Sequence, residues 1–244
     1  MQIPRIYCDS VLTVNTELTL STDASRHVLT VLRLKLSNLL ILFNGQGGEY
    51  LAKLIHVKKN QALVEILEYR IGIPETSVKL HLGQVIAKGD RMDYAIQKAV
   101  ELGVSSITPL YANRCDVKLD EKRLKNRLSH WQKIILHACE QSGRCDVPIL
   151  NSPEDFHCCY FLKASDLKFI CAPGTDSISL SSFGSPKEII VCIGSEGGWE
   201  ENEIELAVKN NFHLLKLGPR ILRTETATVV ALTLMQRFFG DFMN

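Results

Sequence analysis

The stretch "VCIGSEGGWEENEIE", residues 191–205, runs from an apolar segment through three glycines into a charged, helix-like segment. This order predicts a strand, a tight loop and a helix. Glycine-rich loops before helices often bind phosphate, because backbone N–H groups at a helix N-terminus attract anions. Glu196 lies inside this loop, however, and an uncompensated carboxylate beside a phosphate costs energy. The loop therefore favours a ligand that is cationic or offers hydroxyl and amine donors; the alternative is a turn that only leads into the helix.

The spacing of the glycines excludes two common nucleotide-binding loops. Gly194, Gly197 and Gly198 match neither G-x-G-x-x-G in a first βα turn nor G-x-x-x-x-G-K-[ST], and no lysine follows them. A nicotinamide-dependent dehydrogenase and a P-loop nucleotidase are therefore not expected.

Strand-like and helical segments alternate on both sides of this loop. Alternation with nearly continuous apolar strands predicts an α/β domain, in which helices cover both faces of a parallel sheet. Ligands of such sheets bind in loops at the carboxyl ends of the strands. The expected strands are 78–87, 105–111, 167–172, 188–194 and 212–218, and the expected helices are 92–103, 120–141, a segment after Trp199, and 225–239.

The first 72 residues have a different pattern, with short strands between glycine and asparagine turns. This pattern predicts a compact β-barrel or sandwich. One helix is expected at 23–33, capped by Asp23 or Ser25, with Val28, Val31 and Leu32 on its apolar face. The stretch "IGIPETS", residues 71–77, contains glycine and proline and predicts a loop. We therefore expect a boundary here between a domain at 1–72 and a second domain at 73–244.

Composition sets broad limits on the class of protein. The chain has 244 residues, 45% of them hydrophobic, and a formal net charge of +1, so charge alone indicates no nucleic-acid partner. No secretory signal and no run of membrane-spanning length is present, which predicts a soluble cytoplasmic protein. The eight cysteines form no C-x-x-C pair, so we expect reduced thiols and no metal site.

Two further loops follow expected strands: "CAPGT" at 171–175 and "LGPRILRTETA" at 217–227. In the second of these, Arg223 is suited to stabilise charge on a substrate oxygen. Thr224 or Thr226 is expected to cap the last helix. The alternative for this loop is a surface ion pair between Arg223 and Glu225.

Several basic residues are candidates for contact with a nucleic-acid backbone. Clustered lysines and arginines on a small β domain are able to track phosphates, although an ordinary solvated face is the alternative. The candidates are Arg5, Arg26, His27, Arg33, Lys88, Arg91 and Arg114.

A set of motifs, taken together, resembles one known family. The motifs are "IPRIY" at 3–7, "HVLTVLR" at 27–33, "IQKAVELGV" at 96–104, "ACEQSGR" at 138–144, "IGSEGG" at 193–198 and "LGPRILRTETA" at 217–227. In this order, over essentially the whole chain, they resemble the bacterial 16S rRNA (uracil-N3)-methyltransferase family of the SPOUT class.

The resemblance implies a fold, a cofactor and a substrate. It implies a C-terminal SPOUT-type α/β domain with a trefoil knot, a small N-terminal PUA-like β-barrel that helps to bind RNA, and a homodimer. It also implies that S-adenosyl-L-methionine donates a methyl group to N3 of uracil 1498 in 16S rRNA of the small ribosomal subunit. The knot rests on the resemblance alone, because general topology rules argue against one.

The resemblance also implies roles for individual residues. Arg223 would donate a hydrogen bond to a uracil carbonyl oxygen, with Glu196 or Glu225 acting as base or orienting the arginine. The implied cofactor-binding residues are Ala172, Pro173, Gly174, Ile193, Gly194, Gly197, Gly198, Leu217, Gly218, Ile221, Leu222 and Thr224.

Two positions depart from the residues expected there. Ser195 stands where the family commonly has proline. Proline restricts the unfolded chain, so its absence is expected to lower the free energy of unfolding by about 0.4–1 kcal/mol. Glu200 stands where serine would be a better helix cap.

The open alternatives are another SPOUT methyltransferase that acts at a different nucleotide or on ribose, and a catalytically silent RNA-binding module.

Overall fold

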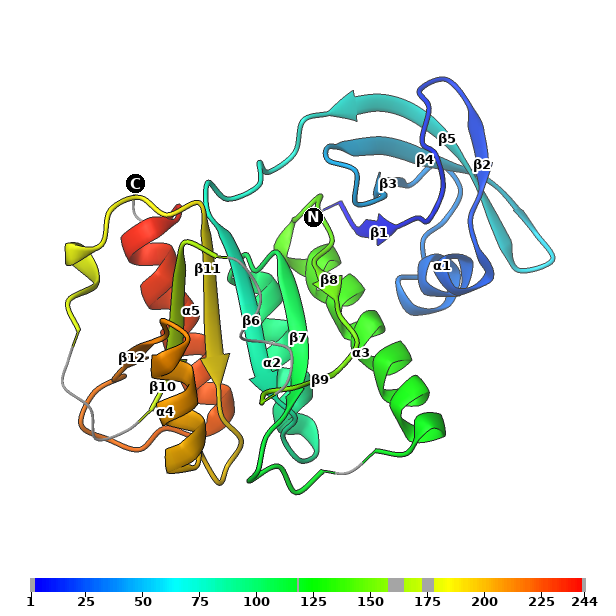
Figure 1. Ribbon diagram of the computed structural model, residues 1–244. Helices are drawn as coiled ribbons and strands as arrows, with labels where there is room; N and C mark the ends of the chain where they lie inside the picture. Colours follow the sequence, from blue (N-terminus) through cyan, green and yellow to red (C-terminus); the bar gives the residue numbers. More distant parts are fainter. Residues whose placement is uncertain (1–2, 118, 158–164, 173–177, 243–244) are drawn as a thin grey trace. The chain divides into compact units, whose positions relative to one another are not determined.

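The computed structural model describes residues 3–117, 119–157, 165–172 and 178–242, which fall into two compact units. Figure 1 shows the course of the chain. The first unit comprises Met1–Glu75 with Leu136–Val147, and the second comprises Thr76–Ile135 with Pro148–Asn244. The expected boundary after residue 72 assigns the whole of 120–141 to the second domain. In the structure, the end of that helix packs with the first unit.

The first unit is built around a five-stranded sheet with the order β1-β3-β4-β5-β2. β1 pairs with β3 in parallel, and the other neighbouring pairs are antiparallel. Alternating buried side chains along β4 and β5 form the core with β3. The strands are β1 Arg5–Tyr7, β2 Glu17–Thr19, β3 Leu39–Phe43, β4 Glu49–Lys58 and β5 Gln61–Arg70.

The helix of this unit begins earlier than predicted and is less regular. α1 spans Thr22–Arg26 and continues as a π-helical turn over His27–Val31. The predicted cap at Asp23 or Ser25 is wrong, because the Ser21 hydroxyl accepts the Ala24 N–H at 3.2 Å. Ser25 is buried and donates to the Leu20 carbonyl. Val31, predicted on the apolar face, is 63% exposed.

The second unit contains the parallel sheet that the sequence predicts. Its order is β12-β10-β11-β6-β7-β8, with β9 also paired to β7, and every pairing is parallel. The strands are β6 Lys79–Val85, β7 Ser106–Tyr111, β8 Ile149–Leu150, β9 Glu154–Asp155, β10 Leu167–Cys171, β11 Glu188–Ile193 and β12 His213–Leu215.

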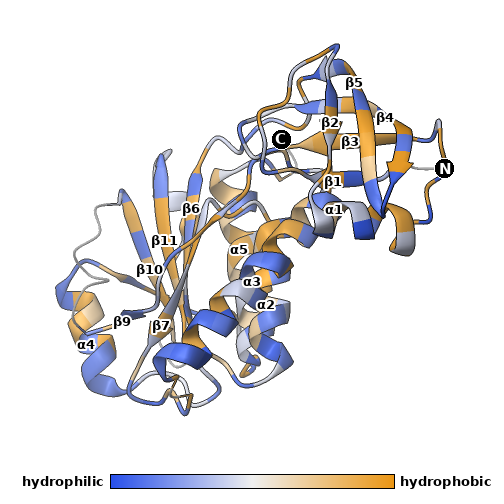
Figure 2. Ribbon diagram, turned by 90° about the vertical axis from the view of Figure 1, so that its right-hand side faces the viewer, coloured by the Kyte–Doolittle hydropathy of each residue, from blue (hydrophilic) through white to orange (hydrophobic). Residues whose placement is uncertain are grey.

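Helices cover both faces of this sheet, as Figure 2 shows. α2 and α5 pack together on one face and α4 lies on the other, where Phe156, Trp199 and Phe212 form an apolar cluster. α3 packs beside α2, and Asp93 accepts hydrogen bonds from Trp131 and His130. The helices are α2 Asp90–Glu101, α3 Glu121–Ser142, α4 Glu201–Lys209 and α5 Thr224–Phe239, with a 3₁₀ turn at Leu180–Ser182.

Two further observations concern the described part of the chain. None of its helices is both long and apolar enough to cross a membrane. Its cysteines, which are Cys8, Cys115, Cys139, Cys145, Cys171 and Cys192, are free thiols, whereas Cys158 and Cys159 lie outside the described residues. The trefoil knot stays a prediction.

Candidate cofactor and RNA site

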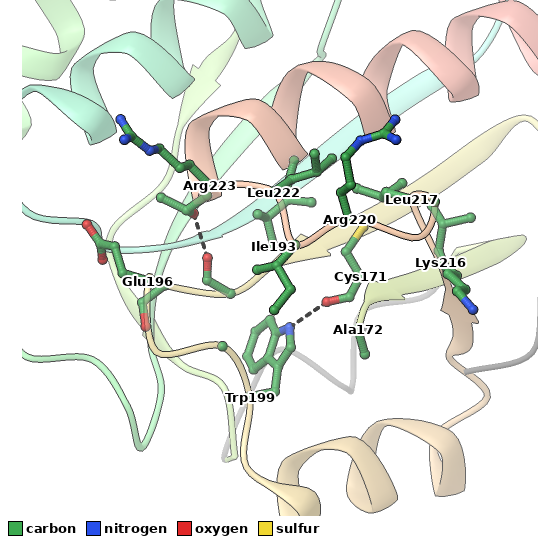
Figure 3. Close-up of a pocket in the computed structure, with 18 of the residues that line it drawn as sticks. Cys171, Ala172, Ile193, Glu196, Trp199, Lys216, Leu217, Arg220, Leu222 and Arg223 are labelled. Atoms are coloured by element: carbon green, nitrogen blue, oxygen red, sulfur yellow. Dashed lines mark hydrogen bonds between the residues drawn. The ribbon is translucent and has the colours of Figure 1, made fainter. Parts of the chain in front are cut away.

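A pocket of about 340 Å³ lies in the second unit, where β10, β11 and β12 end. This is where a parallel sheet is expected to bind a ligand, because the loops after adjacent strands converge there. Figure 3 shows Glu196 and Arg223 on one side, Lys216 on the other, and Ile193 and Trp199 between them. The lining consists of Arg91, Cys171, Ala172, Ile193, Gly194, Ser195, Glu196, Gly198, Trp199, Leu215, Lys216, Leu217, Gly218, Arg220, Ile221, Leu222, Arg223, Thr224 and Ala227.

Trp199 fixes one wall of this pocket. Its indole Nε1 donates a hydrogen bond to the Cys171 carbonyl at 3.1 Å, which ties the loop after β11 to the end of β10. Its ring packs on Phe156, with the ring centroids 4.3 Å apart. Burial raises the pKa of the Cys171 thiol, so this cysteine is neutral and lines the pocket as an apolar group.

The turn at residues 195–198 is held closed by hydrogen bonds. The Gly198 N–H donates to the Ser195 carbonyl at 2.9 Å, and Gly198 has φ of +67°, which glycine adopts without strain. The Ser195 hydroxyl donates to the Arg114 carbonyl at 2.8 Å. In return, the Arg114 guanidinium donates to the Gly197 carbonyl at 3.0 Å. This serine therefore anchors the turn through its side chain, where the proline of the resembled family restricts φ.

We expect Ser195→Ala to weaken binding of the cofactor that the resemblance implies, S-adenosylmethionine, by about three- to tenfold, because it removes one neutral hydrogen bond that holds the turn. Ser195→Pro is expected to restore affinity, since proline restricts the same turn through its ring. Isothermal titration calorimetry with the cofactor measures both variants. Ser181→Ala, which removes an exposed hydroxyl outside the pocket, is the control. Unchanged affinity in Ser195→Ala would mean that the hydroxyl does not hold the turn.

Glu196 extends from this turn to the loop after β6. Its carboxylate accepts hydrogen bonds from the Arg91 guanidinium at 2.7 Å and from the Lys88 N–H at 3.3 Å. Burial raises the pKa of this carboxyl, but hydrogen bonds from its own N–H, from Arg91 and from the Lys88 N–H outweigh burial and lower the pKa below its ordinary value. Glu196 is therefore ionised at neutral pH and is a weak base, which favours an orienting or charge-stabilising role.

Arg223 and the first residues of α5 also line the pocket, on the same side as Glu196 in Figure 3. Arg223 is the residue before α5 and is exposed at the pocket, whereas Thr224 does not cap the helix. The prediction of a Thr224 cap is wrong, because its hydroxyl donates instead to the Gly194 carbonyl at 2.6 Å. The ion pairs of the described residues include none between Arg223 and Glu225.

Most of the predicted cofactor residues lie at this pocket. Gly197 does not line it and packs against Arg114 instead, while Pro173 and Gly174 fall outside the described residues. Glu225 also does not line it, and its Oε2 is buried with no hydrogen-bond partner among the described residues. The predicted residues that do line it are Ala172, Ile193, Gly194, Gly198, Leu217, Gly218, Ile221, Leu222 and Thr224 with Arg223 and Glu196.

Several lining residues were absent from the sequence prediction. Trp199 directly follows the glycines, so an aromatic residue at the end of a ligand loop was the available signal. Lys216 directly precedes the third predicted loop, which itself contains the lining residue Arg220. Arg91 was expected to contact RNA, and its place beside Glu196 depends on pairing between segments far apart in the sequence.

The basic residues of the first unit differ in how available they are. Arg26 and Arg33 are exposed and His27 is half-buried. The side chain of Arg5 is only 8% exposed, forms an ion pair with Glu49 and donates to the Arg144 carbonyl. Arg5 therefore holds the unit together, which argues against its predicted contact with RNA phosphate.

The basic residues of the second unit lie around the turn at 195–198. Lys88 is exposed and forms an ion pair with Asp116 at 2.6 Å. Arg91 and Arg114 bind Glu196 and the Gly197 carbonyl, as described above. Each of these three cations therefore already has a partner, and Arg91 alone of the three lines the pocket.

Comparisons with known proteins agree with this fold and pocket. A family model described as an RNA methyltransferase domain matches residues 74–236, and one described as an RNA methyltransferase PUA domain matches residues 20–67. These matches and the α/β fold define the protein as an RNA methyltransferase.

Individual relatives narrow this class. Ribosomal RNA small subunit methyltransferase E of Buchnera aphidicola is 37% identical over 99% of this chain and 96% of its own length. The same enzyme from Neisseria gonorrhoeae, crystallised with S-adenosyl methionine, is 37% identical, with a TM-score of 0.92 over 99% of this chain and 100% of that one. A methyltransferase from Legionella pneumophila, also with bound cofactor, is 38% identical, with a TM-score of 0.95 over 99% of this chain and 100% of that one. The chain belongs to the ribosomal RNA small subunit methyltransferase E family.

Proposed function

We propose that the protein transfers the methyl group of S-adenosyl-L-methionine to N3 of uracil 1498 in 16S rRNA. The observation that carries this proposal is the pocket at the ends of β10, β11 and β12, lined by loops from all three strands with Arg223 at its rim. Its family membership supports the same conclusion, because relatives with this fold were crystallised with S-adenosylmethionine.

The pocket residues fit the chemistry of this cofactor. The side chains of Ile193, Leu217 and Leu222 offer apolar contact area to the adenosine, and backbone groups of the three loops offer hydrogen bonds. The carboxylate of Glu196 is ionised and paired with Arg91, so it offers an acceptor to donor groups of the cofactor. When bound, the cofactor supplies an electrophilic methyl group on a sulfonium.

Methyl transfer to uracil N3 needs an in-line approach and loss of the imide proton. Positioning of the two reactants accounts for a large part of such catalysis. We assign to Arg223 a hydrogen bond to a uracil carbonyl oxygen, which stabilises the negative charge that develops when the proton leaves. Glu196 or Glu225 is the proposed proton acceptor. Glu196 lines the pocket, but it is held by Arg91 and its lowered pKa makes it a weak base, whereas Glu225 has a buried carboxylate oxygen without a hydrogen-bond partner among the described residues but does not line the pocket.

The target nitrogen takes part in Watson–Crick pairing, so the uridine has to be unpaired or flipped out to reach the pocket. Contacts with the RNA backbone would then place the target, and these contacts carry no base specificity. We assign such contacts to Arg26, His27 and Arg33 of the first unit and to Lys88, Arg91 and Arg114 around the pocket.

Charge reversal in the first unit tests this assignment. Arg26→Glu or Arg33→Glu is expected to weaken RNA binding by about tenfold, because each removes a phosphate contact and adds a repulsive charge. S-adenosylmethionine affinity should stay unchanged, and calorimetry with each ligand measures the two effects separately. Lys58→Glu makes the same charge change at an exposed position of β4. An equal loss of RNA binding in Lys58→Glu would mean that net charge, not a local contact, accounts for the effect.

We further propose that the enzyme is a homodimer and acts in the cytoplasm, where ribosomal RNA is modified. Apolar side chains left exposed in the second unit support a subunit contact: Ile221 is 91% exposed, and Phe238 on α5 is 47% exposed. No metal ion is assigned a role in this mechanism.

Transfer of labelled methyl groups from S-adenosylmethionine to small ribosomal subunits that lack the modification tests the proposed activity. The proposal predicts incorporation into 16S rRNA. No incorporation, together with retained RNA binding, would indicate the silent RNA-binding module.

A further inference from the structure

We propose that Gln84, at the buried end of β6, is a positioning residue. It fixes the position of the turn after β11 relative to the first turn of α5, and both segments line the cofactor pocket. It does so through Thr224 and Thr228 of α5. The inference rests on the proposed function, because the pocket it positions is the one assigned to S-adenosylmethionine. Gln84 does not line that pocket, and the sequence patterns did not single it out.

The hydrogen bonds around Gln84 form a continuous chain from β6 to the pocket. Its amide Nε2 donates to the Thr224 hydroxyl at 3.0 Å, and that hydroxyl donates to the Gly194 carbonyl at 2.6 Å. On the other side, the Thr228 hydroxyl donates to Gln84 Oε1 at 2.6 Å. The side chain of Gln84 therefore links the end of β6, the turn after β11 and the first turn of α5.

This network is buried, and each of its hydrogen-bond donors has an acceptor. Gln84 and Thr228 are 0% exposed and Thr224 is 4% exposed. The second N–H of the Gln84 amide donates to the Val85 carbonyl at 3.1 Å, and the Thr228 hydroxyl also lies 2.9 Å from the Thr224 carbonyl. A buried network in which each member is satisfied defines one arrangement, because any displacement leaves a polar group without a partner.

The two segments joined by Gln84 each carry a functional group, and these two groups lie on the same side of the pocket in Figure 3. Gly194 precedes the turn that presents Glu196, and Thr224 follows Arg223 directly. Both Gly194 and Thr224 themselves line the pocket. A shift between these segments would therefore alter the cofactor pocket and the distance from Arg223 to the uracil, to which catalysis is sensitive.

Two substitutions remove this network without a large change in volume: Gln84→Met and Thr228→Val. The matched control is Thr108→Val on neighbouring β7. Thr108 is 1% exposed, and its hydroxyl accepts a hydrogen bond from Asn151 at 2.9 Å, yet neither residue lines the pocket. Thr228→Val and Thr108→Val each remove one buried hydroxyl, so their melting temperatures are expected to fall by similar amounts, whereas Gln84→Met loses three hydrogen bonds and its melting temperature is expected to fall further.

We expect only the network variants to affect the pocket. Gln84→Met and Thr228→Val should weaken cofactor affinity by about tenfold, and lower the single-turnover rate at saturating ligands by about tenfold, while Thr108→Val changes neither. Without cofactor, amide hydrogen exchange of residues 193–199 and 220–228 should rise in the network variants alone.

The outcomes separate this inference from the proposed function. If wild type binds no S-adenosylmethionine, the proposed function fails, and the exchange measurement still tests whether Gln84 holds the two segments. If the network variants match Thr108→Val in affinity, rate and exchange, Gln84 contributes only to stability and the inference is wrong.

Discussion

Replacing Arg223 by alanine is expected to lower the single-turnover rate of methyl transfer by about 10²–10³-fold at saturating cofactor and RNA. The pocket has this guanidinium at its rim, immediately before α5, with no ion-pair partner among the described residues. A donor that stabilises charge formed only in the transition state affects the rate more than ground-state binding. S-adenosylmethionine affinity should therefore change much less than the rate, which rapid-quench measurements and calorimetry determine independently.

Two further variants sharpen this prediction. Arg223→Lys keeps the charge but loses the planar donor fork, so an intermediate rate is expected if hydrogen-bond geometry matters. Arg237→Ala removes an exposed arginine from the last turn of the same helix and should keep the wild-type rate. A nearly normal single-turnover rate in Arg223→Ala would contradict the assigned role.

Replacing Gly194 by alanine is expected to weaken S-adenosylmethionine binding by at least about tenfold, since polar contacts around the pocket must shift. A Cβ at this position would lie 3.1 Å from Trp199 Nε1 and 3.3 Å from the backbone of Gly198. A shift of Trp199 away from the new methyl group would strain its hydrogen bond to the Cys171 carbonyl. The new methyl group therefore displaces either the tryptophan wall or the turn that carries Glu196.

Gly184→Ala is the matched control for this substitution, because a Cβ there meets no atom within 4 Å and Gly184 does not line the pocket. It should bind the cofactor with wild-type affinity in the same titration. Wild-type affinity in Gly194→Ala would mean that this part of the pocket is not where the cofactor binds.

The sequence predicted the α/β unit well, because its strands and helices have strong local patterns. The apolar run at 188–194 and the amphipathic pattern at 225–239 correspond to β11 and α5 with small differences at their ends. Loops after parallel strands have a known place in such a fold, so three candidate loops could be predicted at one end of the sheet. Most of the residues that the resemblance implies for the cofactor line the pocket there. The prediction that Glu196 disfavours phosphate assumed an uncompensated carboxylate, whereas Arg91 forms an ion pair with it at 2.7 Å.

Features that depend on long-range pairing could not be predicted in this way. Thr224 matches a helix cap in sequence, yet its hydroxyl bonds to Gly194, thirty residues away. Arg5 is a cation of the kind that contacts phosphates, but its guanidinium forms an ion pair with Glu49 and donates a hydrogen bond to the Arg144 carbonyl. The sequence predicted a less rigid turn because Ser195 replaces a proline. The structure shows that the Ser195 hydroxyl holds this turn through a hydrogen bond to the Arg114 carbonyl, a partner that is distant in the sequence.

The most direct test of the proposed function is the identity and position of the modified nucleoside. Small ribosomal subunits that lack the modification are incubated with the enzyme and S-adenosylmethionine, and 16S rRNA fragments are analysed by nucleoside mass spectrometry. The proposal predicts 3-methyluridine at position 1498 and no other new product. A methyl group on another base or on ribose would contradict it and select the alternative methyltransferase.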